Sequence, residues 1–143
     1  MILILDTDLL TLIQRGASVE YQRLIGRLCT NDPRSIYTTI VSFEEQARGW
    51  LAYLARARSV DKQIEGYERL HTFLRDFSVR QVLDFDAPAA EKYQELVRSK
   101  VRIGTLDLKI AAIALTSGAT LLSRNLGDYR KVPGLLVEDW TAI

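Results

Sequence analysis

Residues 2–8 read Ile-Leu-Ile-Leu-Asp-Thr-Asp, and they are the clearest indication of how this chain is built. An unbroken apolar run that ends in a polar turn predicts a strand buried on both faces. A carboxylate at the end of such a strand lies where open α/β sheets bind their ligands. Asp6 and Asp8 place two negative charges there, and no basic residue follows before Arg15. Unless the site is well solvated, we expect a proton, a basic partner or a metal cation to accompany them.

The rest of the chain alternates between predicted strands and predicted helices. Strands are expected at residues 2–6, 35–39, 78–83, 120–122 and 135–137, and helices at residues 8–14, from 18, from about 42 through the fifties, 60–76, 88–99 and 105–115. The third and fourth of these helices are expected to form a helical hairpin. Strands that alternate with helices predict a parallel sheet covered on both faces. Right-handed crossovers then bring the carboxyl end of every strand to one edge of the sheet.

Length and composition favour one globular domain that spans residues 1–143. The chain is 48% hydrophobic and 26% charged, and its net charge of +1 favours no class of partner. With one cysteine and one histidine, it cannot form an internal disulfide or a structural zinc site of its own. We expect Cys29 to be a small buried residue on a helix, the protein to be cytoplasmic, and no segment to span a membrane.

Two further acids follow predicted strand-to-helix junctions. Glu45 lies just after the second strand, and Ser42 and Glu45 also have the spacing of a capping box, which is compatible with a functional role. Asp107 lies in the first turn of the very apolar helix 105–115, where Thr105 is a plausible N-cap. The plainer interpretation of Asp107 is that it complements the positive end of the helix, an effect of about 0.3–1 kcal/mol.

The loop Ser123–Tyr129 follows the fourth strand and supplies more oxygen donors. In a parallel fold the junctions that carry these side chains converge. The converging set is Asp6, Glu45, Asp107 and either Asn125 or Asp128. A cluster of carboxylate and amide oxygens without His or Cys suits a hard cation such as Mg²⁺ or Mn²⁺.

Basic residues flank these acidic junctions. They are Arg48, Arg98, Lys100, Arg102, Arg124, Arg130 and Lys131. Their positions suit contacts with a phosphate backbone. For any single one of them, a solvated charged surface is the simpler interpretation.

The same residues carry a family resemblance that spans nearly the whole chain. They are residues 2–8, Val41-Ser42 through Glu45 to Gly49, Asp107–Ala114, Leu121–Asn125, Asp128-Tyr129, Val132–Leu135 and Trp140. With them the chain resembles the PIN domain, and within it the VapC-like toxins of bacterial toxin–antitoxin pairs. The helix that begins near Asp107 and the Ser-Arg-Asn loop are the most specific of these motifs, and residues 50–100 contribute little.

The resemblance implies a three-layer α/β/α sandwich around a mostly parallel sheet of about five strands. It also implies a metal-dependent endoribonuclease that acts as a toxin, forms a homodimer and is silenced by a cognate antitoxin. In such an enzyme Asp6, Glu45 and Asp107 hold Mg²⁺ or Mn²⁺. The residues expected to orient ligands, water or RNA around them are Asp8, Arg48, Arg102, Ser123, Arg124, Asn125 and Asp128.

Several positions depart from the family pattern. Asp8 stands where Asn or Ser is common, and Ser123 replaces the usual Thr. Asn125 stands where many members have Asp, so the fourth ligand remains open between Asn125 and Asp128. Glu44 neighbours Glu45, and the spacing to Gly49 favours Glu45 as the second ligand.

Three other functions stay open at this point. The first is a PIN nuclease of RNA processing that has no antitoxin, and the second is a catalytically idle PIN-like binding module. The third is a haloacid-dehalogenase-type phosphatase in which Asp6 is the nucleophile. That family expects Thr or Val where this chain has Leu10, and its later motifs have no good match.

Overall fold

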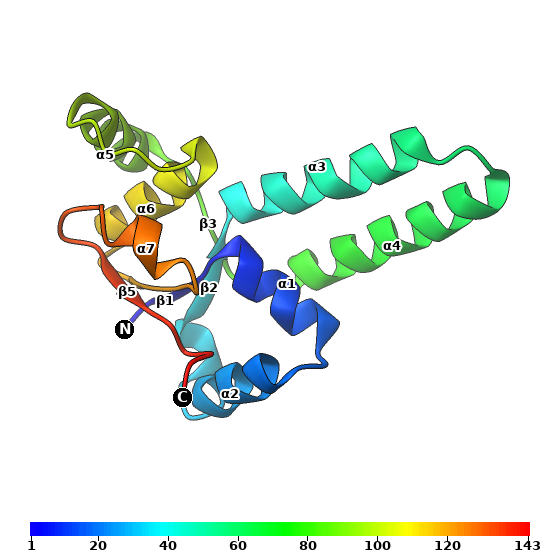
Figure 1. The fold of residues 1–143 in the computed structure, drawn as a ribbon, viewed down its shortest axis with the longest axis horizontal. Helices are drawn as coiled ribbons and strands as arrows, with labels where there is room; N and C mark the ends of the chain where they lie inside the picture. The colour runs from blue at the N-terminus through cyan, green and yellow to red at the C-terminus, as the bar shows by residue number, and fades with distance from the viewer.

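A five-stranded sheet forms the centre of the computed structural model, which describes residues Met1–Ile143 (Figure 1). Its strands are β1 (Leu3–Leu5), β2 (Ile36–Thr39), β3 (Val82–Leu83), β4 (Thr120–Leu122) and β5 (Leu136–Glu138). They lie in the order β3-β2-β1-β4-β5, and every neighbouring pair is parallel. The predicted fold class is therefore confirmed. The third strand is shorter than predicted because residues up to Ser78 belong to the preceding helix.

Seven α-helices connect and cover the strands. They are α1 (Thr7–Arg15), α2 (Val19–Leu28), α3 (Ile40–Arg56), α4 (Val60–Ser78), α5 (Ala87–Arg98), α6 (Thr105–Ser117) and the single turn α7 (Leu126–Tyr129), with a 3₁₀ turn at Pro33–Ser35. No helix is long and apolar enough to cross a membrane. Cys29, which was predicted to be buried, is exposed at the end of α2 because it caps the helix rather than facing the core.

The central strand β1 is buried on both faces, as its apolar run predicts. Leu3 and Leu5 pack on one face against leucines of α1 and α2. Ile4 points the other way and packs against the apolar residues of α5 and α6. The period of two along a strand sends successive side chains to opposite faces, so β1 requires a helical layer on each side. This arrangement produces the three layers.

The connection from β3 to β4 crosses over β2 and β1, so the order of strand addition reverses beside β1. Leu5 pairs with Leu122, and the Asp6 N–H donates to the Leu122 carbonyl at 3.2 Å. The residues that follow β1 and β4 therefore emerge side by side. Such a switch point is where open α/β sheets form their ligand crevices.

Helices α3 and α4 form the predicted hairpin, which reaches away from the sheet (Figure 1). Phe43, Phe73 and Phe77 pack together near its base, with ring centroids 5.1 Å apart in each pair. Further out, an ideal Cβ at Gly66 would lie 2.6 Å from Leu54 Cδ2, so the two helices approach closely there.

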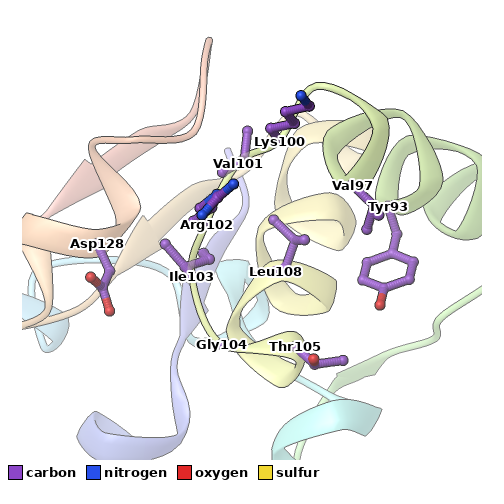
Figure 2. Close-up of a pocket in the computed structure, with 10 residues that line it drawn as sticks. All are labelled: Tyr93, Val97, Lys100, Val101, Arg102, Ile103, Gly104, Thr105, Leu108 and Asp128. Atoms are coloured by element: carbon purple, nitrogen blue, oxygen red, sulfur yellow. The ribbon is translucent and has the colours of Figure 1, made fainter.

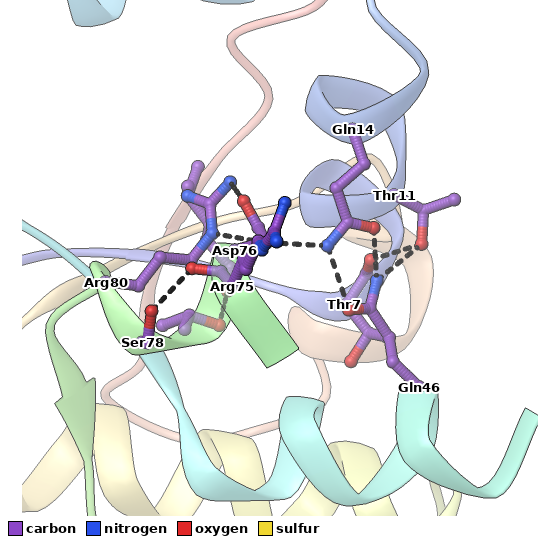
Figure 3. A network of polar contacts seen from close by, with 10 residues as sticks. Thr7, Thr11, Gln14, Gln46, Arg75, Asp76, Ser78 and Arg80 are labelled. Atoms are coloured by element: carbon purple, nitrogen blue, oxygen red, sulfur yellow. Dashed lines mark hydrogen bonds and ion pairs between the residues drawn. The ribbon is translucent and has the colours of Figure 1, made fainter. Parts of the chain in front are cut away.

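A polar network ties α1 to the base of this hairpin (Figure 3). The Gln14 side-chain amide donates to Gln46 Oε1 at 3.1 Å and to Asp76 Oδ2 at 2.9 Å. Arg80 donates two hydrogen bonds of 2.9 Å to the same Asp76 carboxylate. Burial alone would raise the Asp76 pKa, but the hydrogen bonds from Arg80 and Gln14 outweigh it and hold the pKa below its usual value. The network fixes the orientation of α3 relative to α1.

Candidate active site

Asp6 joins the end of β1 to the beginning of α1. Its carboxylate is the N-cap of α1 and accepts from the Leu9 N–H at 3.0 Å. The other carboxylate oxygen accepts from the Ser123 hydroxyl, which follows β4, at 2.5 Å. Asp6 is only 5% exposed. Burial raises its pKa from 3.8 to about 6 against the opposing effect of the two hydrogen bonds, and the nearby charges of Asp8 and Asp107 raise it further.

Glu45 is positioned by the first turns of α3, although the predicted capping box is absent. The N-cap of α3 is Thr39, whose hydroxyl accepts from the Ser42 N–H at 3.1 Å. The helix therefore starts earlier than predicted, and Glu45 is free of a capping role. The Thr7 hydroxyl instead donates to Glu45 Oε1 at 2.8 Å and lies 2.9 Å from the Ser42 hydroxyl. This contact links the second acid to the residue that follows Asp6.

Asp107 lies in the first turn of α6, as predicted. The predicted cap at Thr105 is wrong, because the N-cap is Gly104 and no side chain caps the helix. The Tyr129 hydroxyl of α7 donates to Asp107 Oδ1 at 3.2 Å. Partial burial raises the Asp107 pKa despite this hydrogen bond, and the charge of Asp128 adds to the effect. Burial and the neighbouring Asp107 raise the pKa of Tyr129, so its hydroxyl remains a donor.

Asp8 has no basic neighbour in the sequence, and its positively charged partner is the distant residue Arg124. Arg124 donates to the two Asp8 carboxylate oxygens at 2.7 and 2.8 Å. This bidentate pair fixes the guanidinium geometry. Both side chains remain partly exposed, so the pair holds Arg124 at the surface of the site.

These side chains line a polar hollow of about 380 Å³. Its lining contains no hydrophobic residue and consists of Asp6, Thr7, Asp8, Glu45, Asp107, Arg124 and Asn125. Of the predicted set, Ser123 lies directly behind this wall through its contact with Asp6. The hollow is thus built from residues that follow β1, β2 and β4 and from the start of α6.

Besides Ser123, three predicted residues lie outside this hollow. Arg48 forms an ion pair with Glu44 and lines a separate, largely apolar hollow. Arg102 and Asp128 line a neighbouring groove (Figure 2). Asp128 accepts from the Asn125 side-chain amide at 3.1 Å, so it contacts a residue that lines the hollow.

The donor set of the polar hollow fits a hard divalent cation. Asp6, Glu45 and Asp107 take part in none of the ion pairs of the protein, so their charges lack a cationic partner. No three acidic, His or Cys side chains enclose an ion by themselves. Mg²⁺ usually keeps several waters and binds one or two carboxylates directly, so acids spaced around an open polar hollow suit it.

Thr7 and Tyr129 are the site residues that the sequence pattern did not single out. Each donates its hydroxyl to one of the acids. Thr7 stands between the two aspartates of the opening motif, and Tyr129 follows Asp128. Both belong to the motifs that carry the family resemblance, and that membership is the only indication of them in the sequence.

Comparison with known proteins points to one family. Residues 4–135 match the family described as PIN domain. The chain is similar to Ribonuclease VapC2 of Rickettsia felis, with 31% identity over 83 residues, which are 55% of this chain and 60% of that protein. It is also similar to the tRNA(fMet)-specific endonuclease VapC of Salmonella typhimurium, with 34% identity over 64 residues, which are 42% of this chain and 48% of that protein. The matched segments therefore span less than two thirds of these relatives.

A solved structure extends the similarity over the whole fold. The crystal structure of VapBC2 from Rickettsia felis bound to a DNA fragment from its promoter superposes with a TM-score of 0.71 at 25% identity. The superposition covers 98% of this chain and 99% of that one. The similarity thus includes the β3-β2-β1-β4-β5 sheet and the helical layers on both of its faces.

Proposed function

This chain belongs to the PIN domain family, and we propose that it is an endoribonuclease that hydrolyses RNA phosphodiester bonds with the help of Mg²⁺ or Mn²⁺. One observation carries the proposal. Asp6, Glu45 and Asp107 come from three separate junctions and line one wholly polar hollow, and none of them has an ion-pair partner. Charge of this kind suits a divalent cation and the phosphate that it attracts.

Each acid of the site has its own orienting donor. The Ser123 hydroxyl and the Leu9 N–H fix Asp6, the Thr7 hydroxyl fixes Glu45, and the Tyr129 hydroxyl fixes Asp107. Such outer contacts hold the direction and basicity of ligand carboxylates. We assign Asp6, Glu45 and Asp107 to cation binding, with Asn125 as the amide oxygen donor that completes the set.

A divalent ion bound here supplies positive charge at the scissile phosphate and a water of lowered pKa. Arg124, which Asp8 holds at the edge of the hollow, is positioned to bind a phosphate oxygen. Asp128 supports the site indirectly, because it accepts from the Asn125 amide. Arg48 is not assigned a contact with RNA at this hollow, because it lines a different one.

The similarity to VapC proteins supports a role as the toxin of a VapBC-type pair. The partners in this proposal are an RNA substrate, a cognate antitoxin protein and a second copy of the chain. An RNA-cleaving toxin acts on cellular RNA, so the expected cytoplasmic location is part of the proposal. The haloacid-dehalogenase alternative loses its basis, because the chain belongs to another family.

Neighbouring glutamates allow a sharp test of the assignment. Glu45 lines the polar hollow, whereas Glu44 pairs with Arg48 and lines a different one. With purified protein and labelled RNA in Mg²⁺ or Mn²⁺, Glu45→Gln should lose cleavage and Glu44→Gln should keep it. Equal rates for Glu45→Gln and the wild type would remove Glu45 from the site.

Two further measurements separate the alternatives. A chelator should stop cleavage by the wild type, and cleavage that continues in EDTA would contradict the metal dependence. Induced expression of the wild type should arrest growth, whereas expression of Asp107→Ala should not. Wild-type protein that cleaves RNA in vitro and never slows growth would favour an RNA-processing enzyme, and protein that binds RNA without cleaving it would favour an idle module.

A further inference from the structure

An open groove of about 760 Å³ adjoins the polar hollow of the candidate active site (Figure 2). In Figure 2, α7 with Asp128 lies on one side of the segment from Lys100 to Thr105, and α5 with Tyr93 and Val97 lies on the other. The hydrogen bond between Asn125 and Asp128 joins the lining of the hollow to that of the groove. The groove and the hollow are therefore adjacent.

The groove has a cationic rim and an apolar floor. Lys100 and Arg102 are exposed, and neither takes part in an ion pair. The charge of Asp128, the one acid of the lining, is balanced by Lys131 at 3.5 Å. The apolar part of the lining consists of Tyr93, Val97, Val101, Ile103 and Leu108. The net charge of this surface is thus positive, directly beside three acids.

Lys100 occupies a backbone position that normally belongs to glycine. Its φ of 61° makes it the only non-glycine residue of the chain with positive φ. It follows the end of α5, where the Lys100 N–H donates to the Val97 carbonyl at 3.0 Å and the Val101 N–H donates to the Leu96 carbonyl at 3.2 Å. These contacts define a C-terminal turn that favours glycine, and after α1 and α6 the corresponding residues are Gly16 and Gly118. A lysine there weakens the fold and places a cation at the rim.

We propose that this groove binds a single-stranded segment of the RNA next to the scissile phosphate. Lys100 and Arg102 contact backbone phosphates, and the apolar part of the lining, which includes Val101 and Ile103, contacts the nucleosides. This assignment rests on the proposed ribonuclease function. A positive groove with an apolar and aromatic floor is the common design for single strands, whose bases are free to lie against it. A paired duplex keeps its base faces stacked and gains only the phosphate contacts.

The test uses the full chain and short fluorescein-labelled RNA, either single-stranded or annealed to its complement, with EDTA present to prevent cleavage. The variants are Lys100→Gly, Arg102→Gln and the double variant, and the matched control is Arg58→Gln with Lys62→Gln near the tip of the α3–α4 hairpin. Fluorescence anisotropy at several salt concentrations measures affinity. Each lost phosphate contact should lower the slope of log affinity against log salt by about 0.7, so the double variant should lose about 1.4.

Stability and kinetics distinguish RNA binding from a structural role. Lys100→Gly should raise the melting temperature by about 2–4 °C while it weakens RNA binding, because glycine suits the turn. In Mg²⁺ the double variant should show a higher KM for RNA cleavage and a kcat near that of the wild type.

The outcomes that overturn the assignment are specific. If the double variant binds RNA with the affinity and salt slope of the wild type, the groove assignment is refuted, even when the wild type cleaves RNA normally. An equal loss of RNA affinity in the hairpin-tip control refutes it as well. Tighter binding of duplex than of single strands refutes the single-strand assignment. A wild-type protein that neither binds nor cleaves RNA refutes the proposed function and the groove together.

Discussion

Asp6→Asn should stabilise the metal-free protein at neutral pH, although Asp6 is among the most buried polar residues. The folded state holds this carboxylate at 5% exposure beside Asp8 and Asp107, and its pKa is raised from 3.8 to about 6. A carboxyl whose pKa is higher in the folded protein than in the unfolded one contributes stability that is complete below the unfolded-state pKa. This stability is lost as the pH rises through the folded-state pKa. Above about pH 6 the charged Asp6 therefore destabilises the fold.

The structure sets the size of the effect. A shift from 3.8 to about 6 corresponds to about 3 kcal/mol, at about 1.4 kcal/mol for each pKa unit. Asparagine keeps an oxygen for the Leu9 N–H but loses the acceptor for the Ser123 hydroxyl, which costs about 1 kcal/mol. The net gain is about 2 kcal/mol, or a rise in melting temperature of about 4–8 °C.

Thermal unfolding in EDTA between pH 4 and pH 8 measures this directly. The advantage of Asp6→Asn should be present at pH 8 and disappear near pH 4, because the penalty on the folded carboxylate falls as the pH approaches the unfolded-state pKa of 3.8. Added Mg²⁺ should then stabilise the wild type, by about 2.7 kcal/mol at a hundred times the dissociation constant, and should stabilise the variant far less. Asp84→Asn, at an exposed position, is the control.

Two results would refute the reasoning in different ways. A variant that melts below the wild type at pH 8 in EDTA would show that burial does not penalise the Asp6 charge. An equal response to Mg²⁺ in wild type and variant would show that Asp6 does not bind the cation, whatever its pKa.

Four more substitutions test other contacts. Tyr129→Phe should reduce kcat for RNA cleavage about tenfold or more, because Asp107 loses its orienting hydroxyl, and circular dichroism should show an unchanged fold. Arg124→Lys should weaken RNA binding measured by anisotropy while it changes the free energy of unfolding by less than about 1 kcal/mol, because the pair with Asp8 is partly exposed. Gly66→Ala should lower the free energy of unfolding, measured in urea, by about 1 kcal/mol, because the added Cβ would meet Leu54. Gly49→Ala should raise the free energy of unfolding by about 0.5–1 kcal/mol, because no atom lies within 4 Å of its added Cβ.

Local sequence patterns were sufficient for most of the architecture. The apolar run that ends at Asp6 forms the buried central strand, and the apolar helix after Asp107 packs in the largest core cluster. These patterns succeed because burial on both faces of a strand, or all round a helix, leaves no polar positions. The same reasoning placed Asp6, Glu45 and Asp107 at junctions that share one edge, and the structure brings all three to one hollow.

Helix ends were less well predicted. Thr39 rather than Ser42 caps α3, and Gly104 rather than Thr105 precedes α6. Neighbouring Ser and Thr residues are chemically equivalent as caps, so the sequence offers several candidates within a few residues. For α3 the choice depends on where β2 ends, and the pairing of β2 with β1 and β3 determines that point.

The amino-acid order by itself determined the alternation of strands and helices and which acids stand at the strand ends. Only the tertiary structure decided the partners of those acids. Arg124 neutralises Asp8 across 116 positions, and Ser123 holds Asp6 across 117, because β4 pairs directly with β1. Arg48 and Asp128, equally near the motifs in sequence, face other hollows. Secondary structure follows from local periodicity, whereas contacts between side chains follow from strand order and register, which no local pattern contains.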